Sequence, residues 1–206
     1  MIRDPKDLKR YNASERANHW VIGISFILLA LSGLAFFHPA FYPLTMLFGG
    51  GAWARILHPY IGVIIGAAFA IMFIRFYRLN FITSVDREWM SRVGEMIDGN
   101  DHNMPEQGKY NAGQKLVFWG MAACIFILVA SGLALWRSYI NLPVDLVRFA
   151  AVIHAAAAVI MILIAIVHVY AAIWTKGTIR AMWYGTVTRA WAKQHHRAWY
   201  RQVTGK

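Results

Sequence analysis

The chain of 206 residues is unusually apolar and, at the same time, strongly basic. Hydrophobic residues make up 58% of it, only 15% are charged, and 21 Lys and Arg against 10 Asp and Glu give a net charge of +11. A soluble domain has about 25% charged residues, so the composition argues against a soluble enzyme and against a disordered chain. The single cysteine, Cys124, excludes an internal disulfide, a thiolate iron–sulfur cluster and a four-cysteine zinc site.

Four stretches are almost free of charge: 19–37, 58–74, 116–136 and 149–175. Each approaches or exceeds the roughly 20 apolar residues that a helix needs to cross a bilayer. The first follows a basic segment and leads into a Pro- and Gly-rich one without a cleavage pattern, so we interpret it as a retained helix and not a signal peptide. The predicted spanning helices are approximately 17–37, 54–77, 113–136 and 148–175.

The basic residues predict the orientation. Five precede the first helix, six lie between the second and third, and seven follow the fourth, whereas the other two loops hold three. Eighteen against three is a strong positive-inside signal. We expect an all-α integral membrane protein, an up-down bundle with both termini cytoplasmic. The basic residues are spread over one face of the membrane and require no nucleic acid partner.

Two segments lie outside the predicted bundle. Residues 79–112 are polar and indicate a cytoplasmic loop with one helix around 86–97. Residues 176–206 mix tryptophans with bases, which favours a helix lying on the membrane surface. A basic tail that only anchors the topology is the alternative.

The eight histidines carry the candidate chemistry. Four fall in loops or the tail, where we expect them at the surface: His38, His102, His195 and His196. The others lie in or beside the spanning helices, where ionisable groups are costly and usually functional: His19, His58, His154 and His168. For any one of these alone, an interhelical hydrogen bond is the alternative.

The spacing of these four histidines predicts two pairs. His154 and His168 are 14 residues apart, about 3.9 turns, and therefore share a helix face about 21 Å apart. In the up-down topology, His58 lies at the depth of His154 and forms an outer pair with it, whereas His19 and His168 form an inner pair. Two bis-histidine sites stacked across a bilayer suit two b haems, whose iron then has no open position and transfers electrons. The four stretches contain no Asp or Glu, which disfavours zinc or di-iron.

Glycines and arginines near these depths have two interpretations each. Five glycines provide either room for porphyrins or ordinary helix packing: Gly33, Gly62, Gly66, Gly120 and Gly132. Four arginines at helix ends either meet haem propionates or serve topology and snorkel: Arg16, Arg55, Arg137 and Arg148.

Several segments resemble a known family over approximately Arg10 to Arg201. They are RYNASERANHW, RILHPYIGV, GKYNAGQKLVFWG, SGLALWR and VHVYAAIWTKGTIRAMWYGTVTRAWAKQHH. These segments are similar to the gamma subunits of respiratory formate dehydrogenases, the cytochrome b556 membrane anchors. Anchors of membrane hydrogenases and thiosulfate reductases share the haem histidines but look less like this chain in KYNAGQK and WTKGTIRAM.

The resemblance implies a complex in the bacterial inner membrane. A molybdenum or tungsten catalytic (alpha) subunit oxidises formate, and an iron–sulfur (beta) subunit relays electrons to this chain. The electrons pass through the outer and then the inner of two haem b groups to menaquinone or ubiquinone. This chain itself holds no formate site, and the heterotrimer can assemble further.

The quinone site is expected on the cytoplasmic side, beside the inner haem. The resemblance assigns it to His168, Asn111 and Gly113, with Gln114 and Lys115 adding polarity. Residues 111–114 also begin the third helix, where free backbone N–H groups and the helix dipole favour a developing anion. The alternative is that Asn111 only caps this helix.

Other functions remain open at this point. The chain can be a stand-alone cytochrome b561-type oxidoreductase, a haem-free carrier with histidine relays, or a purely structural anchor.

Overall fold

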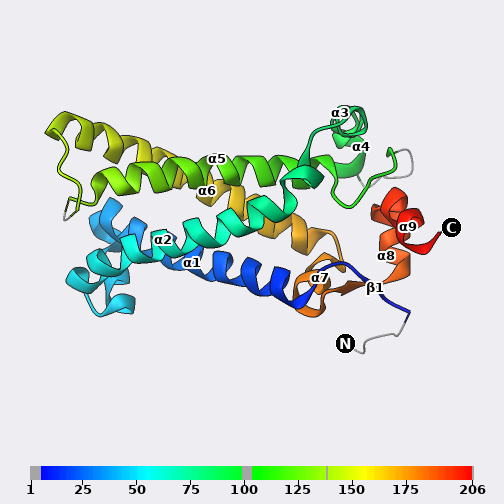
Figure 1. The fold of residues 1–206 in the computed structure, drawn as a ribbon, viewed down its shortest axis with the longest axis horizontal. Coiled ribbons are helices and arrows are strands. Elements are labelled where there is room, and N and C mark those ends of the chain that lie inside the picture. The colour runs from blue at the N-terminus through cyan, green and yellow to red at the C-terminus, as the bar shows by residue number, and fades with distance from the viewer. Residues whose placement is uncertain (1–5, 99–103, 138, 206) are drawn as a thin grey trace. The chain divides into compact units, whose positions relative to one another are not determined.

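Four long helices dominate the computed structural model, which describes residues 6–98, 104–137 and 139–205 (Figure 1). They are α1 (Ala13–Phe37), α2 (Gly51–Phe76), α5 (Ala112–Leu135) and α6 (Val144–Trp174). Each belongs to a span that is long and apolar enough to cross a membrane, with mean hydropathy between 2.0 and 2.8 over its most apolar window. The prediction of four spanning helices in a mostly helical chain is confirmed at this level.

The helices begin earlier than the apolar stretches suggested. At α1, the Asn12 side chain accepts a hydrogen bond from the Glu15 N–H at 2.8 Å, and the Glu15 carboxylate accepts one from the Asn12 N–H at 2.8 Å. This reciprocal cap satisfies backbone donors that helix formation leaves free. It adds a polar first turn that hydropathy alone does not detect. The helix α6 likewise begins at Val144, directly after Pro143.

The remaining elements are short. They are β1 (Leu8–Lys9), η1 (Pro39–Phe48), η2 (Tyr77–Asn80), α3 (Ser84–Ser91), α4 (Val93–Ile97), α7 (Thr178–Tyr184), β2 (Thr186–Val187), α8 (Arg189–His195) and α9 (Arg197–Thr204). Strands β1 and β2 pair antiparallel, with Leu8 opposite Val187. The expectation of a single helix around 86–97 is wrong. The segment holds two helices, α3 and α4, because α3 ends at Ser91 and the backbone of the next residue, Arg92, is not helical.

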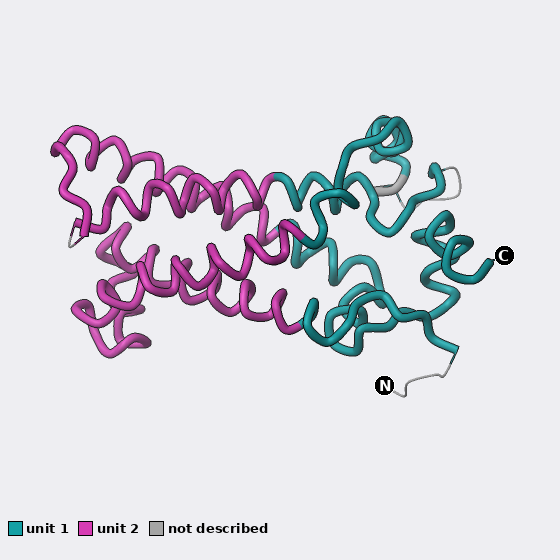
Figure 2. The backbone as a smooth tube through the Cα atoms, viewed as in Figure 1, with its two compact units in different colours: residues 1–16, 75–119, 167–206 teal, residues 17–74, 120–166 magenta. Residues whose placement is uncertain are grey.

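The chain divides into two compact units (Figure 2). Unit 1 comprises residues 1–16, 75–119 and 167–206, and unit 2 comprises residues 17–74 and 120–166. Unit 2 therefore contains most of the predicted membrane-spanning length. Unit 1 contains the loop between α2 and α5 together with the two ends of the chain.

The core of unit 2 is apolar and draws on all four long helices. Its buried members are Phe69 of α2, Cys124 and Ile125 of α5, and Met161 of α6, and Phe26 of α1 packs against them. Large apolar side chains also remain exposed on the outside of these helices, with Phe126 at 76%. An apolar exterior around an apolar core is what a lipid environment requires.

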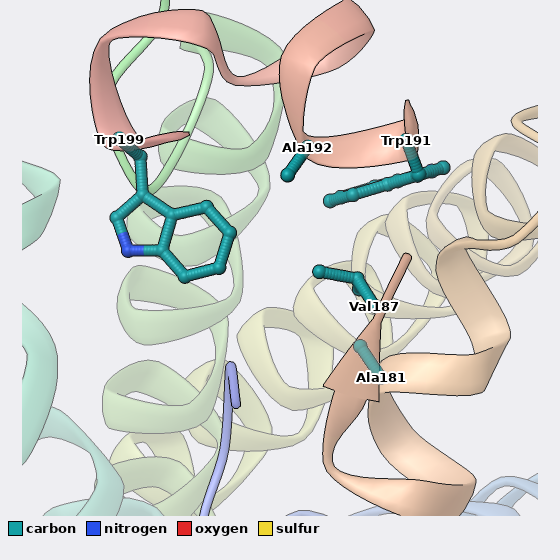
Figure 3. Packing of buried hydrophobic residues seen from close by; sticks show 5 residues of the cluster. All are labelled: Ala181, Val187, Trp191, Ala192 and Trp199. Carbon is teal, nitrogen blue, oxygen red and sulfur yellow. The ribbon is translucent and has the colours of Figure 1, made fainter. Parts of the chain in front are cut away.

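The core of unit 1 is built from the C-terminal segment (Figure 3). Trp191 and Ala192 of α8, Trp199 of α9, Val187 of β2 and Ala181 of α7 are all buried. This differs from the expected surface helix over 176–206. The segment folds into three short helices and a strand. Gly177 and Gly185, both in the left-handed region, precede and follow α7, and the non-helical backbone of His196 separates α8 from α9. Trp191 and Trp199 consequently pack inward, whereas Trp183 is 58% exposed.

Candidate functional site

The predicted outer pair of histidines lies together in unit 2. The rings of His58 on α2 and His154 on α6 have centroids 6.3 Å apart, with their planes inclined at 61°. Both side chains are half-buried. The topology therefore brings together two imidazoles that are 96 positions apart in the sequence.

Each of these histidines contacts a buried serine that was not among the predicted site residues. The Oγ of Ser32 on α1 lies 2.7 Å from the Nδ1 of His58, and the Oγ of Ser131 on α5 lies 2.9 Å from the Nδ1 of His154. Each hydroxyl also bonds to a carbonyl one turn earlier in its own helix. We call these four residues the outer histidine cluster.

Glycines follow both serines and lie against the histidine rings. A Cβ at Gly33 would stand 3.7 Å from the Cε1 of His58, and one at Gly132 would stand 3.3 Å from the Cε1 of His154. A Cβ at Gly132 would press on the His154 imidazole, whereas one at Gly33 would make an ordinary van der Waals contact with the His58 imidazole. A Cβ at Gly66 would stand 3.1 Å from Val129, and one at Gly120 would stand 3.1 Å from Ile164, so these two glycines serve helix packing. A Cβ at Gly62 would meet nothing within 4 Å.

A tandem repeat in the sequence explains the symmetry of this cluster. Residues 10–16 read RYNASER and residues 109–115 read KYNAGQK, and SGLA follows at both 32–35 and 131–134. All of these matches are 99 positions apart, so α1 and α5 occupy equivalent positions in two halves of the chain. This repeat is the signal from which Ser32 and Ser131 can be found in the sequence.

The predicted inner pair does not share one compact unit. His19 belongs to unit 2, where its ring meets Trp20 edge-on at 5.7 Å, and His168 belongs to unit 1. Both are half-buried. The repeat is broken here, because the position equivalent to His19 is Phe118. The pairing of these two histidines stays a prediction.

The segment expected to contact quinone begins α5 with the same reciprocal cap as α1. The Asn111 side chain accepts from the Gln114 N–H at 2.9 Å, and the Gln114 side chain accepts from the Asn111 N–H at 3.1 Å. A Cβ at Gly113 would stand 3.4 Å from the Trp89 ring. Capping, the alternative given for Asn111, is therefore present, and the NH2 group of its side-chain amide is the part that remains to donate elsewhere.

Lys115, in the same segment, is held by the protein. Its Nζ donates to Asp86 Oδ2 at 2.7 Å and to the Phe81 carbonyl at 3.1 Å. Asp86 is buried, which by itself would raise its pKa, but hydrogen bonds from Lys115 and Thr83 outweigh burial and hold the pKa below its usual value. The pair is ionised and ties the loop to α5.

A second cluster in unit 1 surrounds the buried guanidinium of Arg10. The group lies 5.0 Å from the ring centroids of both Trp191 and Trp199 and donates to the Lys109 carbonyl. It also contacts the Nε2 of His196 at 3.3 Å, while the Nδ1 of that ring lies 2.7 Å from the Gly108 carbonyl. Its Nη1 atom is buried without a hydrogen bond. We call this the Arg10 cage.

The expectation of a surface position is wrong for His196, which is 1% exposed. Burial, the neighbouring Arg10 charge and, least, His195 lower the pKa of His196 to about 3, against the opposing bond to the Gly108 carbonyl. The burial of His196 could not be seen from its sequence neighbours, because its partners Arg10 and Gly108 are distant in the sequence. His38 caps η1, accepting from the Ala40 N–H at 3.2 Å. His102 lies outside the described residues.

Two of the four arginines that were predicted to meet haem propionates have partners within this chain. Arg16 donates to the Trp183 carbonyl. Arg148 faces Asp145 at 3.8 Å in an exposed pair. The exposed pair is of the kind that stabilises a protein little.

Comparison with known proteins agrees with the resemblance seen in the sequence. The family described as prokaryotic cytochrome b561 matches residues 10–185. The nitrate-inducible formate dehydrogenase cytochrome b556(Fdn) subunit of Escherichia coli K12 is 42% identical over 200 residues, 96% of this chain and 92% of that protein. The cytochrome b556(fdo) subunit of the same organism is 44% identical over 94% of this chain and 92% of its own length.

A more distant relative gives the same result. The formate dehydrogenase cytochrome b556 subunit of Haemophilus influenzae is 35% identical over 195 residues, 94% of this chain and 82% of that protein. The chain therefore belongs to the prokaryotic cytochrome b561 family, together with the cytochrome b556 subunits of formate dehydrogenases.

Proposed function

We propose that this chain is the di-haem cytochrome b subunit of a membrane-bound formate dehydrogenase and delivers electrons to a membrane quinone. Relatives that carry this name match nearly the whole chain at 35–44% identity. The observation that carries the proposal is the approach of His58 and His154 in a lipid-suited bundle.

The outer histidine cluster fits a haem in its chemistry. His58 and His154 provide two imidazoles, and each Nδ1 is engaged by a serine, so that each Nε2 remains to bind iron. Gly33 and Gly132 keep the space beside the rings free of side chains. We assign these two histidines as the residues that would bind the iron of the outer haem, and His19 and His168 as those that would bind the iron of the inner one.

When bound, the two haems supply one-electron transfer across the membrane, from the outer pair of ligands to the inner pair. His154 and His168 lie 14 residues apart on α6, about 21 Å along its axis. Two histidines on one iron leave no position for a substrate, so the ligands restrict the chemistry to electron transfer.

The orientation follows from the basic residues. Eighteen of 21 lie in the two terminal segments and the loop between α2 and α5, and this bias supports an orientation with both termini on the cytoplasmic side of a bacterial inner membrane. The iron–sulfur (beta) and molybdenum or tungsten (alpha) subunits then bind the opposite face, close to His58 and His154. The complex can assemble further through its lipid-facing helices.

Quinone, either menaquinone or ubiquinone, binds at the first turn of α5 and beside His168. The backbone N–H groups of that turn that the cap leaves free, and the Asn111 side-chain NH2, donate to the quinone carbonyl oxygens, because the N–H groups of Asn111 and Gln114 are already bonded in the cap. Gly113 allows close approach of the ring. Gln114 and Lys115 act indirectly, because Gln114 caps the helix and Lys115 is bound to Asp86. The protons come from the cytoplasm.

A stand-alone cytochrome b561-type oxidoreductase is the second candidate, and the family match over residues 10–185 favours it. An anchor of a hydrogenase or thiosulfate reductase would use the same histidines. Co-purification separates these functions, since only the first proposal expects a formate-oxidising subunit to accompany the chain.

The deciding experiment compares the purified wild-type complex with the variant His154→Ala. We expect haem content to fall by half, with one low-spin b signal lost and the other retained. Phe126→Ala, at a lipid-exposed position of α5 outside the outer histidine cluster, is the control and should keep both signals. Two unchanged haem signals in His154→Ala would overturn the ligand assignment.

A further inference from the structure

We propose that Ser32 and Ser131 are positioning residues that fix the tautomer and orientation of the two outer histidines, so that each presents its Nε2 lone pair to the iron. This inference rests on the proposed ligation by His58 and His154. It assigns a role to two buried hydroxyl groups that bind no cofactor themselves.

Each serine hydroxyl has one proton, and a carbonyl of its own helix accepts it. The Ser32 hydroxyl lies 2.8 Å from the Leu28 carbonyl, and the Ser131 hydroxyl lies 2.6 Å from the Ile127 carbonyl. A carbonyl can only accept, so each serine donates its single proton to its own helix. The serine oxygen is then left with lone pairs only.

The two histidines are therefore the donors in their hydrogen bonds with the serines. Each Nδ1 lies within hydrogen-bond distance of a serine oxygen, at 2.7 Å for His58 and 2.9 Å for His154. Because that oxygen has no proton left to give, the Nδ1–H must donate to it. A neutral imidazole carries one ring proton, so the Nε2 of each ring holds the lone pair.

The tandem repeat shows that this arrangement is built twice. Ser32 and Ser131 are 99 positions apart, each follows a helix cap by 20 residues, and each contacts the histidine of the next long helix. One serine bonded to its own helix is common in membrane helices. Two equivalent serines, each in contact with one histidine of the same pair, indicate that both serve the same role at that pair.

The hydrogen bond has an electronic consequence. Donation from Nδ1–H to an acceptor increases the basicity of Nε2, which strengthens its bond to the metal and favours the oxidised iron. Removing the acceptor should therefore raise the reduction potential of the outer haem. Partners of this kind typically change metal affinity by about 10- to 100-fold when removed.

The test uses the purified holo-complex with Ser32→Ala, Ser131→Ala and the double variant. Ser32→Thr and Ser131→Thr retain a hydroxyl that can bond the same carbonyl. Ser25→Ala is the matched control, because Ser25 is buried on α1 seven residues, about two turns, before Ser32. Haem content, low-spin electron paramagnetic resonance and the midpoint potential of each haem are measured, and His154→Ala identifies the outer signal.

We expect the alanine variants to shift the outer resonance and to raise its potential, the double variant most, without moving the inner signal. The threonine variants should restore both properties, and Ser25→Ala should change neither. If an alanine variant loses the outer haem, retention in the threonine variant still supports the proposal, whereas equal loss in both indicates packing and overturns it.

The failure of this inference is distinguishable from that of the proposed function. Unchanged resonance and potential in the alanine variants, with His154→Ala losing one haem, would reject the serines and leave the ligands standing. Two haems retained in His154→Ala would reject the ligand assignment, and the serine proposal with it.

Discussion

Units 1 and 2 of this chain each have an apolar core, and they differ in the polar groups that accompany it. Unit 2 packs Phe69, Ile125 and Met161 against apolar neighbours, and it contains the outer histidine cluster. Unit 1 buries charge instead, in the Lys115–Asp86 pair and the Arg10 cage. In lipid, a helix needs only apolar side chains to be stable, so polar groups there mark function. Outside it, burial of charge requires partners, and polar groups mark structure.

The strongest test of this difference is to break the buried ion pair of unit 1. Lys115→Met leaves the Asp86 carboxylate buried without its cation, and we expect about 3–5 kcal/mol of destabilisation. Hydrogen exchange of α3 and the start of α5 in the purified complex measures it. The double variant Lys115→Met/Asp86→Leu should recover part of this loss, because it removes the unpaired carboxylate but also the hydrogen bonds that Asp86 accepts from Thr83.

The control is the exposed pair on α3. Glu88 and Arg92 lie 3.3 Å apart with side chains 52% and 40% exposed, so Glu88→Gln should cost less than about 1 kcal/mol. An equally small effect of Lys115→Met would mean that unit 1 does not depend on buried charge.

The second prediction concerns the stability of unit 1 at acid pH. The pKa of His196 is lowered to about 3 by burial, Arg10 and, least, His195, against the Gly108 carbonyl, whereas in the unfolded chain it is about 6.5. Below pH 6.5 the unfolded chain binds a proton that the folded one does not. Unit 1 should therefore lose about 1.4 kcal/mol per pH unit from pH 6.5 down to about 3.

Limited proteolysis of α8 and α9 between pH 7.5 and 5 measures this loss. His196→Gln removes the titrating group and should flatten the profile, although its stability at pH 7.5 falls. A wild-type profile that is flat across this range would show that the cage does not exclude the proton.

The same contrast explains what the sequence could predict. The four spanning helices follow from uninterrupted apolar stretches, and the approach of His58 and His154 follows from helix geometry and alternating direction. Both depend on local periodicity. The first turns of α1 and α5 lie outside the apolar stretches, and only their caps reveal them.

The Arg10 cage could not be predicted in this way. Arg10 and His196 are 186 positions apart, and neither has a neighbouring residue that indicates burial. Ser32 and Ser131 are an intermediate case, because their repeat is visible in the sequence but has meaning only once the histidines beside them are placed.

The third prediction uses the repeat to separate capping from quinone binding. Asn12 and Asn111 cap α1 and α5 by the same hydrogen bonds, so replacing either with Ala should cost about 1 kcal/mol. Only Asn111→Ala should lower quinone reduction by formate, with both haems still reduced. Stopped-flow spectra of haem reduction and quinone turnover measure the two steps. Equal turnover losses in both variants would assign Asn111 to structure alone.

The smallest expected effect distinguishes the two halves of the outer histidine cluster. An added Cβ at Gly132 would stand 3.3 Å from the His154 ring, closer than ordinary van der Waals contact, whereas one at Gly33 would stand 3.7 Å from the His58 ring. Gly132→Ala should therefore tilt its imidazole and shift the outer haem resonance, while Gly33→Ala should leave it nearly unchanged. Both variants gain the same helix propensity, so their difference isolates the contact. Gly62→Ala, where a Cβ meets nothing within 4 Å, is the control. A shift from Gly33→Ala equal to that from Gly132→Ala would show that a general change in helix packing, and not pressure on one ligand, moves the signal.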